Sequence, residues 1–153
     1  MSSYIIKSDQ NQSVEGNAIL GTHPVQALPF FTTTVQAGFP SPADDYLEGA
    51  LNLNEHLIRR PAATFFLRVL GESMIGAGIH SGDLLIVDRS IDPIDGRIVI
   101  AIVDGDLTVK RLSKKRGRIH LISENSCYPP IEIREGQNLQ IWGVVLHAIH
   151  SFT

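Results

Sequence analysis

The sequence predicts a mostly β protein: a compact antiparallel sheet, or a barrel-like version of it, with an extended N-terminal arm and a short helix. Three observations favour this architecture. Short segments rich in β-branched, aliphatic and aromatic residues recur from residue 64 to residue 147. Turn-forming residues separate these segments, with no long helical pattern between them. The first 37 residues carry few charges. Short strands without intervening helices are typical of antiparallel sheets and barrels.

Residues 1–37 are predicted to form the arm, because two glycines and two prolines interrupt any helical period there. Within it, Phe30–Gln36 is rich in aromatic and β-branched residues, which favours an extended backbone. Two prolines and a glycine then make Ala37–Pro42 an irregular, exposed connection. An extended segment of this kind suits a protease substrate, because peptides bind proteases as strands. On composition alone, an ordinary linker is the simpler interpretation.

Residues 44–60 are predicted to be helical, and Pro61 follows the end of that region. One apolar stripe would consist of Leu47, Ala50 and Leu51. Asn54 can cap a short second helical piece. Beyond Pro61 the chain becomes a series of strands, and the expected strands are Thr64–Leu70, Leu84–Asp88, Arg97–Val103, Leu107–Leu112, Arg118–Ser123 and Leu139–His147.

The composition limits the class of protein. The chain of 153 residues is 43% hydrophobic, enough for one compact domain plus an arm. A net charge of −3 does not indicate a protein held to nucleic acid by phosphate contacts. The longest apolar run, Ile98–Val103, is too short to span a bilayer, and the N-terminus does not resemble a secretory signal. A single cysteine, Cys127, excludes an internal disulfide. We therefore expect a cytoplasmic protein without a cofactor or metal.

Ser73 is a candidate nucleophile. It follows the strand-like segment Thr64–Leu70, where Gly71 begins a glycine-rich turn. Such a turn can present a hydroxyl at the end of a rigid element, with free backbone N–H groups beside it for an oxyanion. The pattern differs from the nucleophile elbow of α/β-hydrolases, and no Ser-x-x-Lys sequence occurs. From position alone, an ordinary serine in a turn remains the simpler interpretation.

Lys110 is a candidate base because of its place in the strand-like segment Leu107–Leu112. Strand alternation directs Lys110 and its neighbour Arg111 to opposite faces, so one of these cations can point inward. Burial would lower the pKa of a lysine but would leave an arginine charged. The simpler alternative is that both cations are exposed, with the stem of Lys110 lying on the sheet.

The remaining candidate residues give weaker indications of a functional site. The histidines show no metal-ligand spacing except His147 and His150, which would point to opposite faces of a strand. His80 lies near Ser73 in the sequence and could be a conventional base, or simply a solvated loop residue. A basic hairpin tip could touch DNA or an acidic partner, although a solvated charged turn is the simpler interpretation; it consists of Arg111, Lys114, Lys115, Arg116 and Arg118.

Four segments together resemble the LexA/UmuD family of self-cleaving serine peptidases, and most closely its UmuD-type accessory subunits of error-prone DNA polymerases. The segments are Ala37–Ala43, Gly71–Ile75, Gly82–Asp88 and Thr108–Leu112. The resemblance covers about residues 28–149, and the order and spacing of the segments make it specific. It implies that Ser73 is the nucleophile, Lys110 the general base and Ala37-Gly38 the scissile bond. It also implies that the backbone N–H groups of Ser73 and Glu72 hold the oxyanion.

The resemblance also implies a biological role. Residues 1–37 would be removed by self-cleavage, and a RecA–single-stranded DNA filament would promote the cut after DNA damage. Residues 38–153 would remain as the peptidase domain, a homodimer that joins a UmuC-like translesion polymerase of the Y family. The arm is too short and too poor in helical pattern for the DNA-binding domain of a LexA repressor, so direct operator binding is not expected. A non-catalytic β-domain that only binds the polymerase is the alternative.

Overall fold

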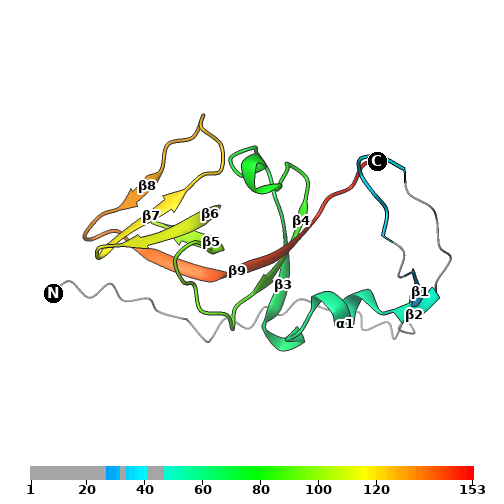
Figure 1. Ribbon diagram of the computed structural model, residues 1–153. Coiled ribbons are helices and arrows are strands. Elements are labelled where there is room, and N and C mark those ends of the chain that lie inside the picture. Colours follow the sequence, from blue (N-terminus) through cyan, green and yellow to red (C-terminus); the bar gives the residue numbers. More distant parts are fainter. Residues whose placement is uncertain (1–26, 32–33, 41–46) are drawn as a thin grey trace. The chain divides into compact units, whose positions relative to one another are not determined.

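The structure is a computed structural model that describes residues 27–31, 34–40 and 47–153 (Figure 1). It divides into two units, one formed by residues 60–153 and the other by the described residues up to 59, and each is described by itself. The prediction of a mostly β protein is confirmed, with antiparallel pairing throughout the described sheets and one short α-helix there. Most of the predicted arm, residues 1–26, lies outside the described residues.

Residues 60–153 form a seven-stranded sheet with the order β3-β4-β9-β5-β6-β7-β8. Its strands are β3 (Thr64–Arg68), β4 (Leu84–Asp88), β5 (Ile98–Val103), β6 (Asp106–Lys115), β7 (Arg118–Ile122), β8 (Ile131–Ile133) and β9 (Leu139–Ile149). The barrel-like version of the prediction is not adopted, because β3 and β8 are the two edges of an open sheet in the described residues. Two single-turn 3₁₀ helices lie at Pro61–Ala63 and Ile75–Ala77.

The long strand β9 joins the two halves of the sheet, and Figure 1 shows it running between β4 and β5. Its first half pairs with β5 and its second half pairs with β4. Strand alternation then builds two cores, because successive side chains point to opposite faces. On β5, Val99 belongs to one cluster of buried apolar side chains and Ile100 to the other. The second cluster includes Met74, one residue after Ser73.

The other unit contains a hairpin in which β1 (Leu28–Phe31) pairs with β2 (Leu47–Leu51). The prediction of a helix over residues 44–60 is therefore wrong for Leu47–Leu51; residues 44–46 lie outside the described part. Gly49 explains the difference, because it adopts φ +147° and pairs with Phe30 of β1. Glycine is also a poor helix former. The residues expected to form an apolar stripe on a helix, Leu47, Ala50 and Leu51, therefore belong to strand β2.

Among the described residues of the predicted helical region, only Leu53–Leu57 form an α-helix, α1. Its N-cap is Asn52, whose side chain accepts a hydrogen bond from the backbone N–H of Asn54 at 3.1 Å. Asn54 is therefore the capped residue and not the cap. In the extended segment expected at Phe30–Gln36, Phe30–Phe31 is strand and Thr34–Gln36 is irregular, while residues 32–33 lie outside the described residues.

Candidate active site

Ser73 lies in a loop between β3 and β4, which we call the Ser73 loop (residues 70–82). Two backbone hydrogen bonds close its base: the N–H of Val69 donates to the carbonyl of Asp83 at 2.9 Å, and the N–H of Gly82 donates to that of Val69 at 2.8 Å. The buried side chains of Met74 and Ile79 anchor the loop in the core. Ser73 therefore lies on a loop whose two ends are joined by hydrogen bonds and whose apolar side chains pack into the core.

A second loop, which follows β7, forms hydrogen bonds with the Ser73 loop. The N–H of Glu124 donates to the carbonyl of Ser73 at 2.8 Å, and the carbonyl of Glu124 accepts from the N–H of Gly76 at 2.7 Å. The amide of Asn125 donates to the carbonyl of Glu72 at 2.9 Å. A Cβ at position 76 would lie 2.5 Å from the Glu124 carbonyl oxygen, so this close approach requires glycine.

Lys110 enters the site from β6 and points inward, with only 8% of its surface exposed. Its Nζ lies 2.8 Å from Oγ of Ser73 and 3.1 Å from the carbonyl oxygen of Val109. Burial lowers the pKa of the Lys110 amine below its ordinary value, because the charged form loses hydration. The structure thus brings together the predicted nucleophile and the predicted base, which are 37 residues apart in the chain.

Arg111 points to the opposite face of β6, as strand alternation predicts. It forms an ion pair with Glu124 and donates a hydrogen bond to the carbonyl of Gly96 at 2.7 Å. The same strand therefore supplies the amine beside Ser73 and a contact to the loop that supports Ser73. Sequence reasoning missed the part played by Glu124, and the only local signal for it was the glycine at position 76.

A pocket of about 260 Å³ opens beside Ser73. Most of its lining is apolar, and the residues that line it are Leu67, Arg68, Val69, Leu70, Ser73, Leu85, Ile100, Leu107, Thr108 and Val109. Strands β3 and β6 and the Ser73 loop all contribute. An apolar pocket next to a hydroxyl can accept a small aliphatic side chain and exclude water from the reacting atoms.

The backbone N–H groups of Glu72 and Ser73 follow one another in the Ser73 loop, and Ser73 lines this pocket. No hydrogen bond in the described part of the chain uses either of them. Unpaired N–H groups beside a nucleophile can stabilise the negative oxygen of a tetrahedral intermediate. The arrangement therefore has the components of acyl transfer: a hydroxyl, a buried amine, free N–H donors and a pocket.

The remaining predicted residues lie elsewhere. Ala37 and Gly38 belong to the other unit, where both are exposed and outside any helix or strand. His80, considered above as a conventional base, contacts Asp83 instead of Ser73. His147 is exposed on β9, and His150 lies just beyond that strand beside Asp83.

Comparison with known proteins places this geometry in a family. Residues 29–146 match the family described as Peptidase S24-like. Protein SamA of Salmonella typhimurium is 54% identical over 129 residues, which cover 84% of this chain and 89% of that protein. Protein ImpA of Escherichia coli is 51% identical over 80% of this chain and 83% of the relative. The LexA repressor of Aliivibrio salmonicida is 41% identical over 78% of this chain but only 58% of the repressor.

Proposed function

The chain belongs to the peptidase S24-like family, as its resemblance to LexA and UmuD predicted, and we propose that it is a self-cleaving serine peptidase of the DNA-damage response. The observation that carries the proposal is the 2.8 Å distance between Oγ of Ser73 and Nζ of a buried Lys110. A hydroxyl becomes a nucleophile when a base takes its proton, and a lysine is a base only when its amine is neutral. Burial favours that neutral form.

In the proposed reaction, Oγ of Ser73 attacks the carbonyl carbon of Ala37 while Nζ of Lys110 accepts the hydroxyl proton. The N–H groups of Ser73 and Glu72 stabilise the resulting oxyanion. The bond to Gly38 then breaks, and Lys110 returns the proton to the leaving amine. Water hydrolyses the ester left on Ser73, again with Lys110 as the base, and this step regenerates the free hydroxyl.

The pocket and the tether support Ala37-Gly38 as the substrate. A methyl side chain suits a small apolar pocket, and a glycine after the scissile bond lets the backbone bend past the nucleophile. Because the substrate belongs to the same chain, its effective concentration is high, and docking of the segment can limit the rate. We propose that a RecA–single-stranded DNA filament promotes the docked state.

The product would be residues 38–153, which separate from the arm of residues 1–37. We propose that this product forms a homodimer and serves as the accessory subunit of a UmuC-like Y-family polymerase in the cytoplasm. No helix among the described residues is long and apolar enough to cross a membrane. Direct sequence-specific DNA binding is not part of the proposal, and the alternative is a non-catalytic β-domain that only binds the polymerase.

Incubation at increasing pH distinguishes a self-cleaving peptidase from a non-catalytic binding domain. The lowered pKa of Lys110 places the loss of its proton below the ordinary lysine value of 10.5, so self-cleavage should rise with pH in that range. Mass spectrometry should find fragments that end at Ala37 and begin at Gly38. A non-catalytic domain would stay intact at every pH.

Three variants test the assigned roles. Ser73→Ala and Lys110→Ala should each slow cleavage at least about a thousandfold, with and without the RecA filament. Lys115→Ala is the matched control, because Lys115 is an exposed lysine on the same strand, and its rate should be unchanged. Cleavage that continues in Lys110→Ala would exclude this lysine as the base.

A further inference from the structure

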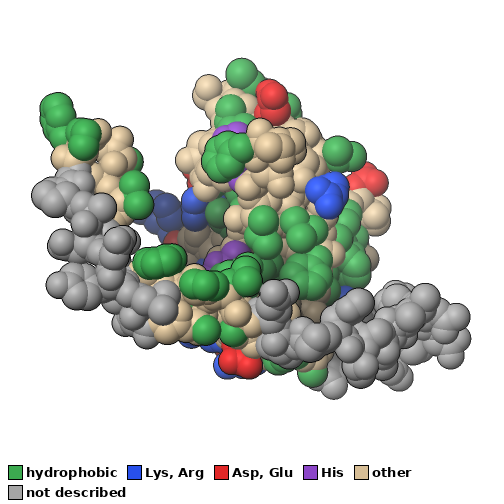
Figure 2. Space-filling model, turned by 90° about the vertical axis from the view of Figure 1, so that its right-hand side faces the viewer, with side chains coloured by type: hydrophobic (Ala, Val, Ile, Leu, Met, Phe, Trp, Pro, Cys, Tyr) green, Lys and Arg blue, Asp and Glu red, His purple; other side chains and the backbone are tan. Residues whose placement is uncertain are grey.

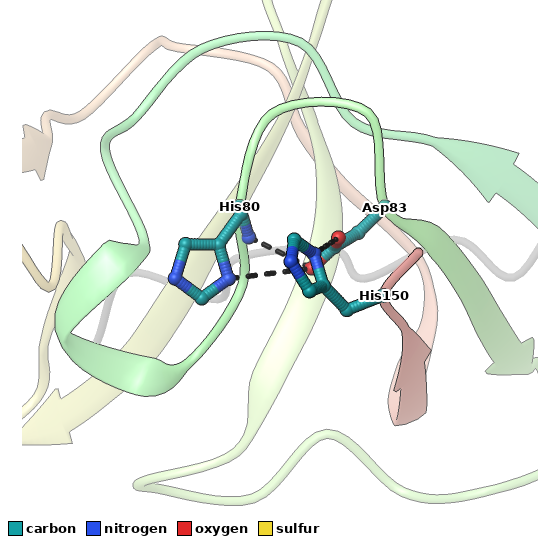
Figure 3. A group of neighbouring side chains, drawn as sticks. All are labelled: His80, Asp83 and His150. Atoms are coloured by element: carbon teal, nitrogen blue, oxygen red, sulfur yellow. Dashed lines mark hydrogen bonds and ion pairs between the residues drawn. The ribbon is translucent and has the colours of Figure 1, made fainter. Parts of the chain in front are cut away.

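Three side chains meet on the side of β4 where the Ser73 loop ends. His80 lies near the end of that loop, Asp83 just before β4, and His150 just after β9 (Figure 3). Their candidate ligand atoms all lie within 4.8 Å of one another. His150 is 67 residues from Asp83 in the chain and reaches it through the pairing of β4 with β9, whereas His80 is three residues from Asp83 in the same turn.

Asp83 is the fixed member of this cluster. Its side chain is 1% exposed and accepts hydrogen bonds from the backbone N–H of His80 at 2.8 Å and from Nδ1 of His150 at 2.6 Å. Burial works to raise the pKa of Asp83, but these hydrogen bonds and the nearby imidazoles outweigh it and hold the pKa below its usual range. The two hydrogen bonds therefore hold the carboxylate in a fixed orientation beside the two rings.

The two imidazoles are less fully paired. Nδ1 of His80 lies 3.8 Å from the carboxylate of Asp83, too far for a hydrogen bond, and its ring makes no other hydrogen bond to the described residues. The ring centres of His80 and His150 are 4.8 Å apart. Both rings are partly exposed, so a dissolved ion can reach them. Two imidazoles and one ionised carboxylate are thus gathered at a point accessible from solvent.

We propose that His80, Asp83 and His150 form a binding site for Zn²⁺. Two imidazoles and a carboxylate are a donor set that suits zinc better than calcium or magnesium, which prefer oxygen ligands. Neutral imidazole nitrogens bind the ion, so the proton that His150 now shares with Asp83 is released to solvent or carried by the other ring nitrogen. Water takes the fourth position, because three protein ligands leave it open.

The site adds a restraint to the part of the chain that carries Ser73. Asp83 accepts, through its backbone carbonyl, one of the hydrogen bonds that close the Ser73 loop. An ion bound by His80, Asp83 and His150 links that loop to the end of β9. Because zinc binds the folded chain, the melting temperature should rise with zinc concentration. A simple hydrogen-bonded cluster without an ion would show no such dependence.

The test uses the full chain with the Ser73→Ala substitution, so that it remains intact whatever the outcome for self-cleavage. Calorimetric titration with Zn²⁺ should show one specific site per chain. His80→Ala and His150→Ala should each weaken binding at least about tenfold. His147→Ala is the matched control, because His147 is exposed on β9 outside the cluster, and Cys127→Ser controls for the exposed thiol.

Cobalt absorption and the zinc dependence of the melting temperature test the site independently. Co²⁺ should replace Zn²⁺ and give visible absorption bands that the two histidine substitutions abolish. The zinc-dependent rise in melting temperature should disappear in the same variants and persist in His147→Ala. The proposal fails if the chain binds no zinc, or if His80→Ala and His150→Ala bind it as tightly as the His147→Ala control. Both substitutions are at partly exposed positions, so neither depends on replacing the buried Asp83.

Discussion

The seven-stranded sheet and the β1–β2 hairpin are both antiparallel, but they differ in the solvent exposure of their apolar side chains. In the sheet, Val87, Val99 and Leu112 are each 0% exposed. In the hairpin, Leu28 is 58% exposed and Phe31 is 56% exposed. A two-stranded hairpin without a buried face is marginally stable, whereas several strands with a common core are stable on their own. Stability is therefore concentrated in the unit that carries Ser73 and Lys110.

This difference in stability agrees with the different roles of the two units in the proposed reaction. A nucleophile and its base must be held in fixed geometry, whereas a substrate segment must rearrange to dock. The exposed apolar residues near the proposed cleavage site include Val35 and Phe39, at 93% and 91% exposure. Figure 2 shows apolar side chains at several places on the face that it draws. Docking that covers Val35 and Phe39 would be favourable because it removes apolar surface from water.

A matched pair of leucine substitutions tests the contrast most strongly. Leu112→Ala in the sheet should lower the free energy of unfolding by about 2–5 kcal/mol, because it leaves a cavity in a closed core. Leu28→Ala in the hairpin should change it by less than about 0.5 kcal/mol. Urea denaturation of both variants in a Ser73→Ala background gives the comparison. Similar losses in the two variants would mean that the hairpin is as important for stability as the sheet.

Gly76→Ala tests whether the support beneath Ser73 is as rigid as the sheet. The new methyl group would collide with the Glu124 carbonyl oxygen, which should cost about 1–3 kcal/mol and slow self-cleavage. Glu124→Ala is the control, because it keeps that carbonyl and removes only the partly exposed ion pair with Arg111, worth less than about 1 kcal/mol. Unchanged stability and cleavage in Gly76→Ala would show that the turn adjusts freely.

The smallest expected effect concerns Lys110, a buried amine inside the stable unit. Lys110→Met should raise the free energy of unfolding near pH 7 by roughly 1 kcal/mol while abolishing cleavage, because it removes a buried amine. The folded-state pKa of Lys110 is lowered, so the folded state carries the cost of the buried charge at pH values below it. That cost declines as pH rises from the folded pKa towards the unfolded value near 10.5.

Denaturation at several pH values measures this effect. The advantage of Lys110→Met over the natural chain should be largest near neutral pH and should shrink towards pH 10.5. Lys115→Met, an exposed change on the same strand, should give no such trend. An advantage that grew with pH would contradict the assigned direction of the pKa shift.

Local pattern was sufficient to predict most of the sheet. Leu84–Asp88 was predicted with its observed bounds, and Leu107–Leu112 is the centre of the longer β6. Runs of β-branched and aliphatic residues between turns are a local property, and alternation further predicted that Lys110 and Arg111 would face opposite ways. Strands Leu47–Leu51 and Ile131–Ile133 were missed, because the apolar spacing of the first also fits a helix and the second has only three residues.

Local sequence patterns were enough to predict the class of fold, most strands of the sheet and the residue types able to carry out acyl transfer. Four sequence segments, in their order along the chain, also revealed the resemblance to a peptidase family. Only the tertiary structure decided which of these residues meet. Lys110 reaches Ser73, Glu124 supports the turn, and His150 joins Asp83, all through strand pairings that link distant parts of the chain. Local preferences set the direction of a side chain along its strand, whereas contact between strands depends on the topology of the whole sheet.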